Sequence, residues 1–170
     1  TYPYFMTLGE DAFSKDSVIT GNLKQMMFAE GGAVAPVKDT PYTFEPLIQT
    51  TENSGTVAGN MAAFMQPQDM ARDIKLDGKK RTLAALVTGK FKTAFPGGAP
   101  ALEEGKQGPQ GHKTEAGAET TVLVVADVDF LADRNSVRII PFFNQQMVRV
   151  INDNLNFLLN AADFLGGSQD

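Results

Sequence analysis

The sequence contains no cysteine and only one histidine. The absence of cysteine excludes disulfides, thiolate metal sites and cysteine nucleophiles. A pair of metal-binding histidines is also excluded. The single histidine, His112, lies in a glycine- and proline-rich segment and lacks the rigid support that a Ser-His-Asp triad requires. The glycine motifs that cradle phosphates are missing as well. We therefore expect a protein that is not an enzyme, with no cofactor and no metal.

Dense positive charge and long apolar runs are also lacking. The formal net charge is −5, and the one compact basic run, KKR at residues 79–81, is too short to follow a phosphate backbone. We therefore expect no nucleic-acid partner. No apolar run approaches the ~18 residues that a bilayer span needs. Because both ends of the sequence look like cuts, we expect residues 1–170 to be a single domain of a longer chain.

The segment TTVLVVADVDFLADRNS, residues 120–136, carries the strongest structural signal. Its apolar run at 122–126 is rich in β-branched residues and has no polar interruption. Such a run is typical of a strand buried on both faces of a parallel sheet. A second run, residues 83–87, is predicted to lie in the same sheet. We expect an α/β fold in which strand 122–126 is central and parallel to its neighbours, with helices covering the sheet.

Three aspartates, Asp127, Asp129 and Asp133, follow this strand and form the candidate site. Ligands collect beyond the carboxyl ends of parallel strands, and Asp127 and Asp129 would project to one side of an extended backbone. Their oxygens suit a polar ligand or a hard cation such as magnesium or calcium. The favoured interpretation is structural, because aspartates at strand ends commonly accept backbone N–H bonds in the following turn or helix.

Two segments flank this strand. Residues 96–119 contain six glycines and several prolines, and they are predicted to form a flexible loop that folding does not require. Residues 144–165 are predicted to form one long helix packed on the sheet. Asn152 and Asn156 are assigned to its opposite, solvated face, which is alternatively a partner surface. The predicted apolar face is Val150, Ile151, Leu155, Leu158, Leu159 and Ala162.

Four blocks of sequence occur in an order that resembles a known family. They are LIQTT at 47–51, KKRTLAALVTGKFKTAF at 79–95, VLVVADVDFLADR at 122–134 and NLNFLLNAADFLGGSQD at 154–170. Together they resemble the GldG-like auxiliary component of uncharacterised ABC-type transport systems, a group named after bacterial gliding motility. The sequence departs from the family pattern at Ala126, where glycine is usual, at Val128, where a small polar residue is usual, and at Phe164, where tryptophan is usual.

This resemblance implies a Rossmann-like layered fold of the class I glutamine-amidotransferase type, without the amidotransferase nucleophile. It also implies an extracytoplasmic, periplasmic domain anchored to the inner membrane by segments outside these residues. The expected partners are the ABC permease and ATPase subunits of the same system. The leading hypothesis is a non-catalytic domain that acts by protein contact or by handling a ligand beside the permease. The alternative is a periplasmic module that binds a glycan or another exported ligand near Asp127 and Asp129.

Overall fold

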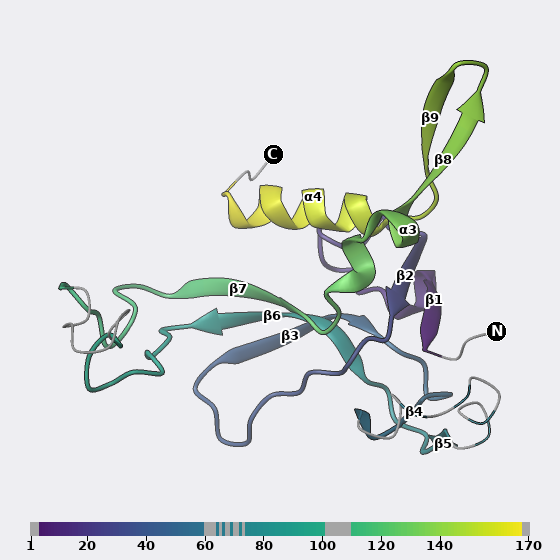
Figure 1. Cartoon of the computed structure of the whole chain (residues 1–170). Coiled ribbons are helices and arrows are strands. Elements are labelled where there is room, and N and C mark those ends of the chain that lie inside the picture. Colours follow the sequence, from purple (N-terminus) through teal and green to yellow (C-terminus); the bar gives the residue numbers. More distant parts are fainter. Residues whose placement is uncertain are drawn as a thin grey trace.

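The structure is a computed structural model that describes residues 4–59, 64, 66, 69, 72, 74–100 and 110–167. Strands β1 (Phe5–Gly9) and β2 (Gln25–Ala29) form one antiparallel pair. A three-stranded sheet has the order β3 (Thr43–Gln49), β6 (Thr82–Gly89), β7 (Thr120–Val125). The remaining pairs are β4 (Gly55–Thr56) with β5 (Lys75–Leu76), and β8 (Val137–Phe142) with β9 (Gln145–Val150). The helical elements are η1 (Glu10–Ala12), η2 (Asp129–Leu131), α3 (Asp133–Ser136) and α4 (Asn154–Leu165) (Figure 1).

The two predicted strands do share a sheet, but their arrangement differs from the prediction. Strand β7 runs antiparallel to β6, with Ala84 opposite Val125, and β6 is the central strand. The side chain of Val122 is 43% exposed, so β7 is not buried on both faces. The prediction of a central, parallel strand at 122–126 is therefore wrong. An unbroken apolar run signals burial, but it does not specify strand direction or position in the sheet.

The connection between β6 and β7 explains why these strands are antiparallel. Just beyond the strands, the backbone N–H of Thr93 donates to Thr114 and that of Ala116 donates to Phe91. The connection thus leaves and returns as a widened hairpin, which joins neighbouring strands in opposite directions. Residues 101–109 of the predicted flexible loop lie outside the described residues. The likeness to a class I glutamine-amidotransferase fold stays a prediction.

The core lies where β2, the β3–β6–β7 sheet, η2 and α4 meet. Three buried rings connect these elements. The centroid of Phe130 lies 5.9 Å from that of Phe28 and 6.0 Å from that of Phe157. Leu83 and Leu86 of β6 are buried in the same cluster. Because each aromatic side chain removes a large apolar area from water, these contacts between distant segments stabilise the whole fold.

The predicted helix 144–165 is divided into a strand and a shorter helix. Residues 145–150 form β9, which pairs with β8, and α4 begins only at Asn154. Alternation of Val148 and Val150 with Arg149 is the two-residue period of a strand. In this segment the predicted helix is therefore wrong. Strands β8 and β9 form a hairpin that projects away from the rest of the molecule (Figure 1).

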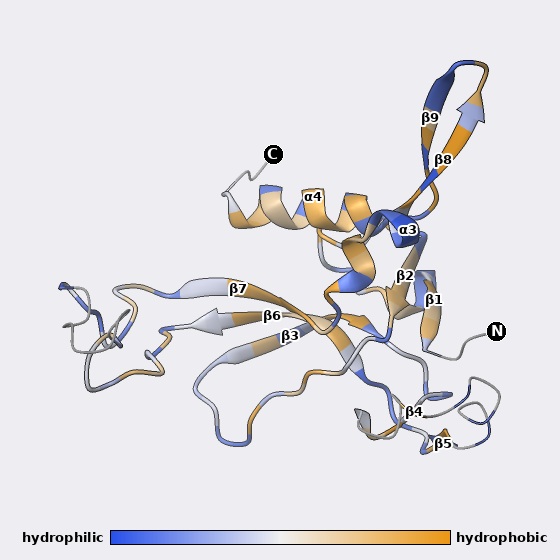
Figure 2. Cartoon of the chain, in the orientation of Figure 1, coloured by the Kyte–Doolittle hydropathy of each residue, from blue (hydrophilic) through white to orange (hydrophobic). Residues whose placement is uncertain are grey.

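Helix α4 also buries a different face from the one predicted. Its buried residues are Asn154, Phe157 and Ala161, spaced three and four apart. Leu158, Leu159 and the neighbouring apolar residues lie towards solvent instead. The prediction chose the wider apolar stripe as the packed face, whereas one phenylalanine and one asparagine anchor the helix. Figure 2 shows apolar residues on α4 and on the projecting hairpin.

Candidate functional site

The carboxylate of Asp127 is buried and bound to the backbone at the junction of three segments. One oxygen accepts the N–H groups of Asp129 and Phe130 at 2.7 and 3.1 Å. The other accepts the N–H of Ala29 in β2 at 2.6 Å. Asp127 thus organises the start of η2 and joins it to β2. The favoured structural interpretation of Asp127 is confirmed.

The side-chain carboxylates of Asp129 and Asp133 take no part in this arrangement. The backbone turns immediately after Asp127, because Val128 has helical dihedral angles, so Asp127 and Asp129 are not alternate residues of an extended strand. The carboxylate of Asp129 pairs with Arg134 at 3.1 Å, and Asp133 is exposed in the first turn of α3. Among the described residues no three acidic or imidazole groups converge to hold a metal ion. Ligand contact by Asp129 or Asp133 stays a prediction.

Two carboxylates that bind backbone N–H groups have opposite pKa shifts. Burial raises the pKa of Asp127, although three backbone N–H groups favour its ionised form. Burial acts in the same direction on Asp153, but the N–H groups of Lys24 and Gln25, the amide of Asn156 and the charge of Lys24 together outweigh it and lower the pKa of that carboxyl. Both carboxylates therefore take part in structural hydrogen bonds with the backbone.

Three asparagines in and just before the last helix attach it to the body. The amide of Asn154 is buried, where it accepts the N–H of Met27 and donates to the carbonyls of Met27 and Phe130. Asn152 donates to Asn135, and Asn160 donates to the carbonyl of Ile19. The solvated-face assignment is therefore wrong for Asn152, and it holds for Asn156, which is exposed. Asparagine is a poor helix former, and here it is used for polar anchoring.

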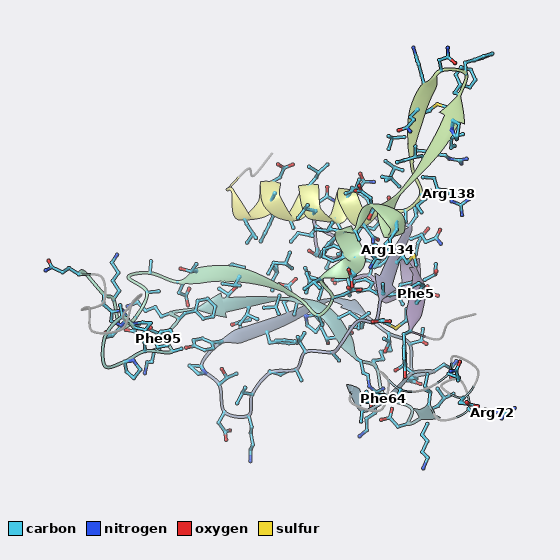
Figure 3. All side chains as sticks on the ribbon, viewed as in Figure 1. Phe5, Phe64, Arg72, Phe95, Arg134 and Arg138 are labelled. Atoms are coloured by element: carbon cyan, nitrogen blue, oxygen red, sulfur yellow. The ribbon has the colours of Figure 1, made fainter. Side chains whose placement is uncertain are left out.

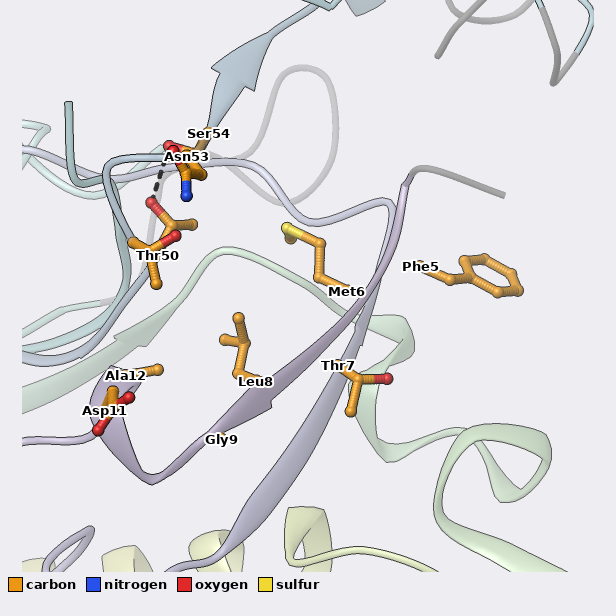
Figure 4. Close-up of a pocket in the computed structure, with 11 residues that line it drawn as sticks. Phe5, Met6, Thr7, Leu8, Gly9, Asp11, Ala12, Thr50, Asn53 and Ser54 are labelled. Carbon is orange, nitrogen blue, oxygen red and sulfur yellow. Dashed lines mark hydrogen bonds between the residues drawn. The ribbon is translucent and has the colours of Figure 1, made fainter. Parts of the chain in front are cut away.

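A hollow lies beside β1. It has a volume of about 440 Å³ and is open to solvent. Figure 4 shows Met6 and Leu8 pointing towards the segment that carries Thr50 and Ser54, while Thr7 points away from it. The hydroxyls of Thr50 and Ser54 are 2.9 Å apart, and Arg81 donates to Ser54. The hollow therefore combines an apolar floor with a rim of hydroxyl groups.

Two surfaces on the described residues expose apolar side chains without core contacts. The first is the outer face of α4, which we call the α4 face and which consists of Leu155, Leu158, Leu159, Ala162 and Leu165. The second is the β8–β9 hairpin. Both were missed because the whole segment was assigned to one packed helix. The available signal was the alternation at 145–150, preceded by the residues Phe143-Asn144 that separate the two strands.

The chain matches the model of one protein family, described as ABC-type uncharacterized transport system, over residues 1–161. No curated protein and no solved structure matches it. The chain therefore belongs to this family and is an auxiliary component of an ABC-type transport system. Members are not typically catalytic, and membership implies association with transporter components. In the described part of the chain no helix has the length and apolarity to cross a bilayer.

Proposed function

We propose that this chain is a non-catalytic domain that acts by protein contact beside the permease of its transport system. The observation that carries this proposal is the α4 face. Leu158, Leu159 and Leu165 are exposed, and Leu155 is half-buried, along one side of a helix that contains no basic residue and a single acidic residue. A row of apolar side chains at helical spacing matches the way in which helices bind apolar grooves or other helices.

Copurification of the full-length chain with its permease and ATPase subunits tests this role. Leu159 is 61% exposed, so Leu159→Asp leaves the core intact and places a charge in the proposed interface. We expect at least a tenfold loss of copurified subunits, about 1.4 kcal/mol of binding free energy. Leu76→Asp is the matched control, because Leu76 is 63% exposed on β5. Equal recovery of the subunits with both variants would exclude the α4 face as the contact.

We further propose that the domain is extracytoplasmic and belongs to the gliding-motility type of these systems. The four sequence blocks that resemble the GldG-like group support this assignment. It places the domain on the periplasmic side, anchored through segments outside residues 1–170. Protease added to intact spheroplasts should then cleave the domain, whereas a cytoplasmic marker protein should survive. Protection of the domain until the cells are lysed would contradict the location.

A module that binds a glycan or another exported ligand is the second candidate function. The hollow beside β1 favours it, because hydroxyl groups around an apolar floor suit a sugar ring. A saturable rise in melting temperature with added sugars, abolished by Leu8→Arg at the floor, would support this function. A melting temperature that sugars do not change would leave the hollow without this role.

A further inference from the structure

The β8–β9 hairpin exposes apolar side chains on both of its faces. In the antiparallel register, Ile139 lies opposite Val148 on one face, and Ile140 lies opposite Met147 on the other. Every residue of β9 is exposed, as is the turn that follows β8. A hairpin that covered a protein core would bury one face. Here an apolar surface surrounds the hairpin, which projects from the body as a separate arm (Figure 1).

The composition of this arm changes from its base to its tip. Arg138 and Arg149 lie directly opposite each other near the base, and Phe142 and Phe143 lie at the tip, where their rings pack edge to face with centroids 4.8 Å apart. Phe142 lies four positions beyond Arg138 along the strand, a length of roughly 13 Å. Cations therefore lie behind an aromatic tip, and long arginine side chains can extend along the hairpin towards a surface that the tip enters.

The charge of the arm is opposite to that of the rest of the chain. Residues 135–152 contain two arginines and no acidic residue, so their formal charge is +2. The rest has 13 basic and 20 acidic residues, a formal charge of −7. Facing like charges destabilise a strand pair, and in the described part of the chain neither Arg138 nor Arg149 forms an ion pair. The arginine pair is thus complementary to an anionic surface.

The tip residue Phe143 is not explained by folding. Its side chain is 92% exposed and its φ is 52°, in the left-handed region that glycine and asparagine adopt more readily. A bulky apolar residue at such a position costs backbone strain and contributes no burial. Such outliers are concentrated at binding elements, where an external contact compensates for the strain.

We infer that the β8–β9 hairpin inserts its tip into the interface of an anionic lipid bilayer. Phe142, Phe143 and Met147 enter the boundary between headgroups and acyl chains, to a depth of about 5–10 Å. The guanidinium groups of Arg138 and Arg149 then lie among the lipid phosphates. The hairpin has two strands, so each strand has an outer edge of backbone polar groups, which limits insertion to the hydrated interface. This inference does not depend on the protein contact proposed for α4.

A fluorescent tip tests insertion directly, because the chain has no tryptophan of its own. With vesicles of equal parts phosphatidylglycerol and phosphatidylcholine, the emission of Phe143→Trp should move to shorter wavelength. Phe64→Trp is the control, since Phe64 is 90% exposed and lies near β4 and β5, at a distance from the hairpin (Figure 3). Its emission should not change.

Sedimentation with the same vesicles measures how much each group contributes. Replacing Phe142 and Phe143 together by Ser should reduce vesicle binding at least tenfold, whereas Phe64→Ser should not. Arg138→Gln and Arg149→Gln should each reduce it roughly fivefold, an effect that added salt removes. Arg72→Gln provides the charge-matched control at an exposed arginine far from the hairpin.

Two results would overturn the inference. One is an emission of Phe143→Trp that vesicles leave unchanged, with equal sedimentation of the tip and control variants. The other is a tip variant that loses its transporter subunits while the parent chain binds no vesicles, which would make the hairpin a protein contact. Leu159→Asp should retain full vesicle binding, so failure of the α4 proposal is distinguishable from failure of this one.

Discussion

Asn154 shows how one buried amide can hold together segments that are distant in sequence. Its side chain bonds to the backbone of Met27 and of Phe130. Asn154→Ala removes the partners of three buried backbone groups. We expect a loss of about 3 kcal/mol in the free energy of unfolding, since each unsatisfied group costs roughly 1–3 kcal/mol and relaxation recovers part. Asn156→Ala, at an exposed position, should change stability by about 0.5 kcal/mol or less. Urea unfolding of both variants measures the difference, and equal effects would contradict the anchoring role.

Asp127 and Asp153 should give opposite pH dependence to stability. The pKa of Asp127 in the folded state is raised above its usual 3.8, so folding takes up a proton at pH values between the usual and the raised pKa. The contribution of Asp127 to the free energy of unfolding therefore increases as pH falls from the raised pKa to 3.8. The pKa of Asp153 is lowered, so its contribution is present above 3.8 and lost as pH falls through the folded-state value. Urea unfolding at pH values from about 7 down to about 3 measures the free energy of unfolding of the parent chain and of each variant. As pH falls, the difference in this free energy between the parent chain and Asp127→Asn should change in favour of the parent chain, and the difference between the parent chain and Asp153→Asn should change in favour of the variant. Parallel pH profiles for the two variants would contradict these assignments.

At the scale of the element, α4 should depend on its narrow buried face. Phe157 is fully buried against Phe130, so Phe157→Ala should cost about 3–5 kcal/mol through lost burial and the cavity left behind. Leu158 is 41% exposed, and Leu158→Ala should cost about 1 kcal/mol or less. Chemical denaturation of the two variants gives the comparison. A larger loss for Leu158→Ala would mean that the wider apolar stripe is the packed face after all.

The elements also show what the sequence could predict. Strand positions 83–87 and 122–126 were predictable, because each is an unbroken run of apolar, mostly strand-forming residues, and their membership of one sheet is confirmed. Their antiparallel direction was not, since it is set by the widened hairpin between β6 and β7. The helix at 154–165 was predictable from its spacing, but its packed face depends on Asn154, whose partners lie in β2 and η2. No local pattern reveals such a partner.

The same reasoning applies to the candidate site. That Asp127 would bind backbone N–H groups follows from its place at a strand end. One of the N–H groups that Asp127 accepts belongs to Ala29, 98 residues earlier in the sequence. No local sequence pattern predicts a contact over that distance. The hairpin was missed for a different reason. In residues 145–150 the two-residue period is brief and merges with the apolar residues of the following helix, so one long helix fitted the pattern as well.

At the scale of the molecule, the β8–β9 hairpin should be separable from the fold. Replacing residues 139–148 by Asn-Gly joins Arg138 to Arg149 through a tight turn that suits antiparallel strands. Because the removed residues pack on no core element, the shortened chain should keep its melting temperature within a few degrees, about 1 kcal/mol of stability. It should retain the fold seen by circular dichroism and lose vesicle binding. A collapse of the melting temperature would show that the hairpin stabilises the fold.

The contacts between β2 and the end of the chain govern the order in which this protein is completed during synthesis. The backbone N–H of Met27 can donate to its native acceptor only after Asn154 has been synthesised. The N–H groups of Lys24 and Gln25 likewise require the carboxylate of Asp153. During synthesis from the N-terminus, β2 lacks these partners while the 127 positions from Met27 to Asn154 are added. Contacts so distant in sequence slow folding, because long segments must be ordered before the contacts form. The nascent polypeptide therefore cannot close this core until α4 has been made, and an interval remains in which chaperones or a translocation channel can engage it unfolded.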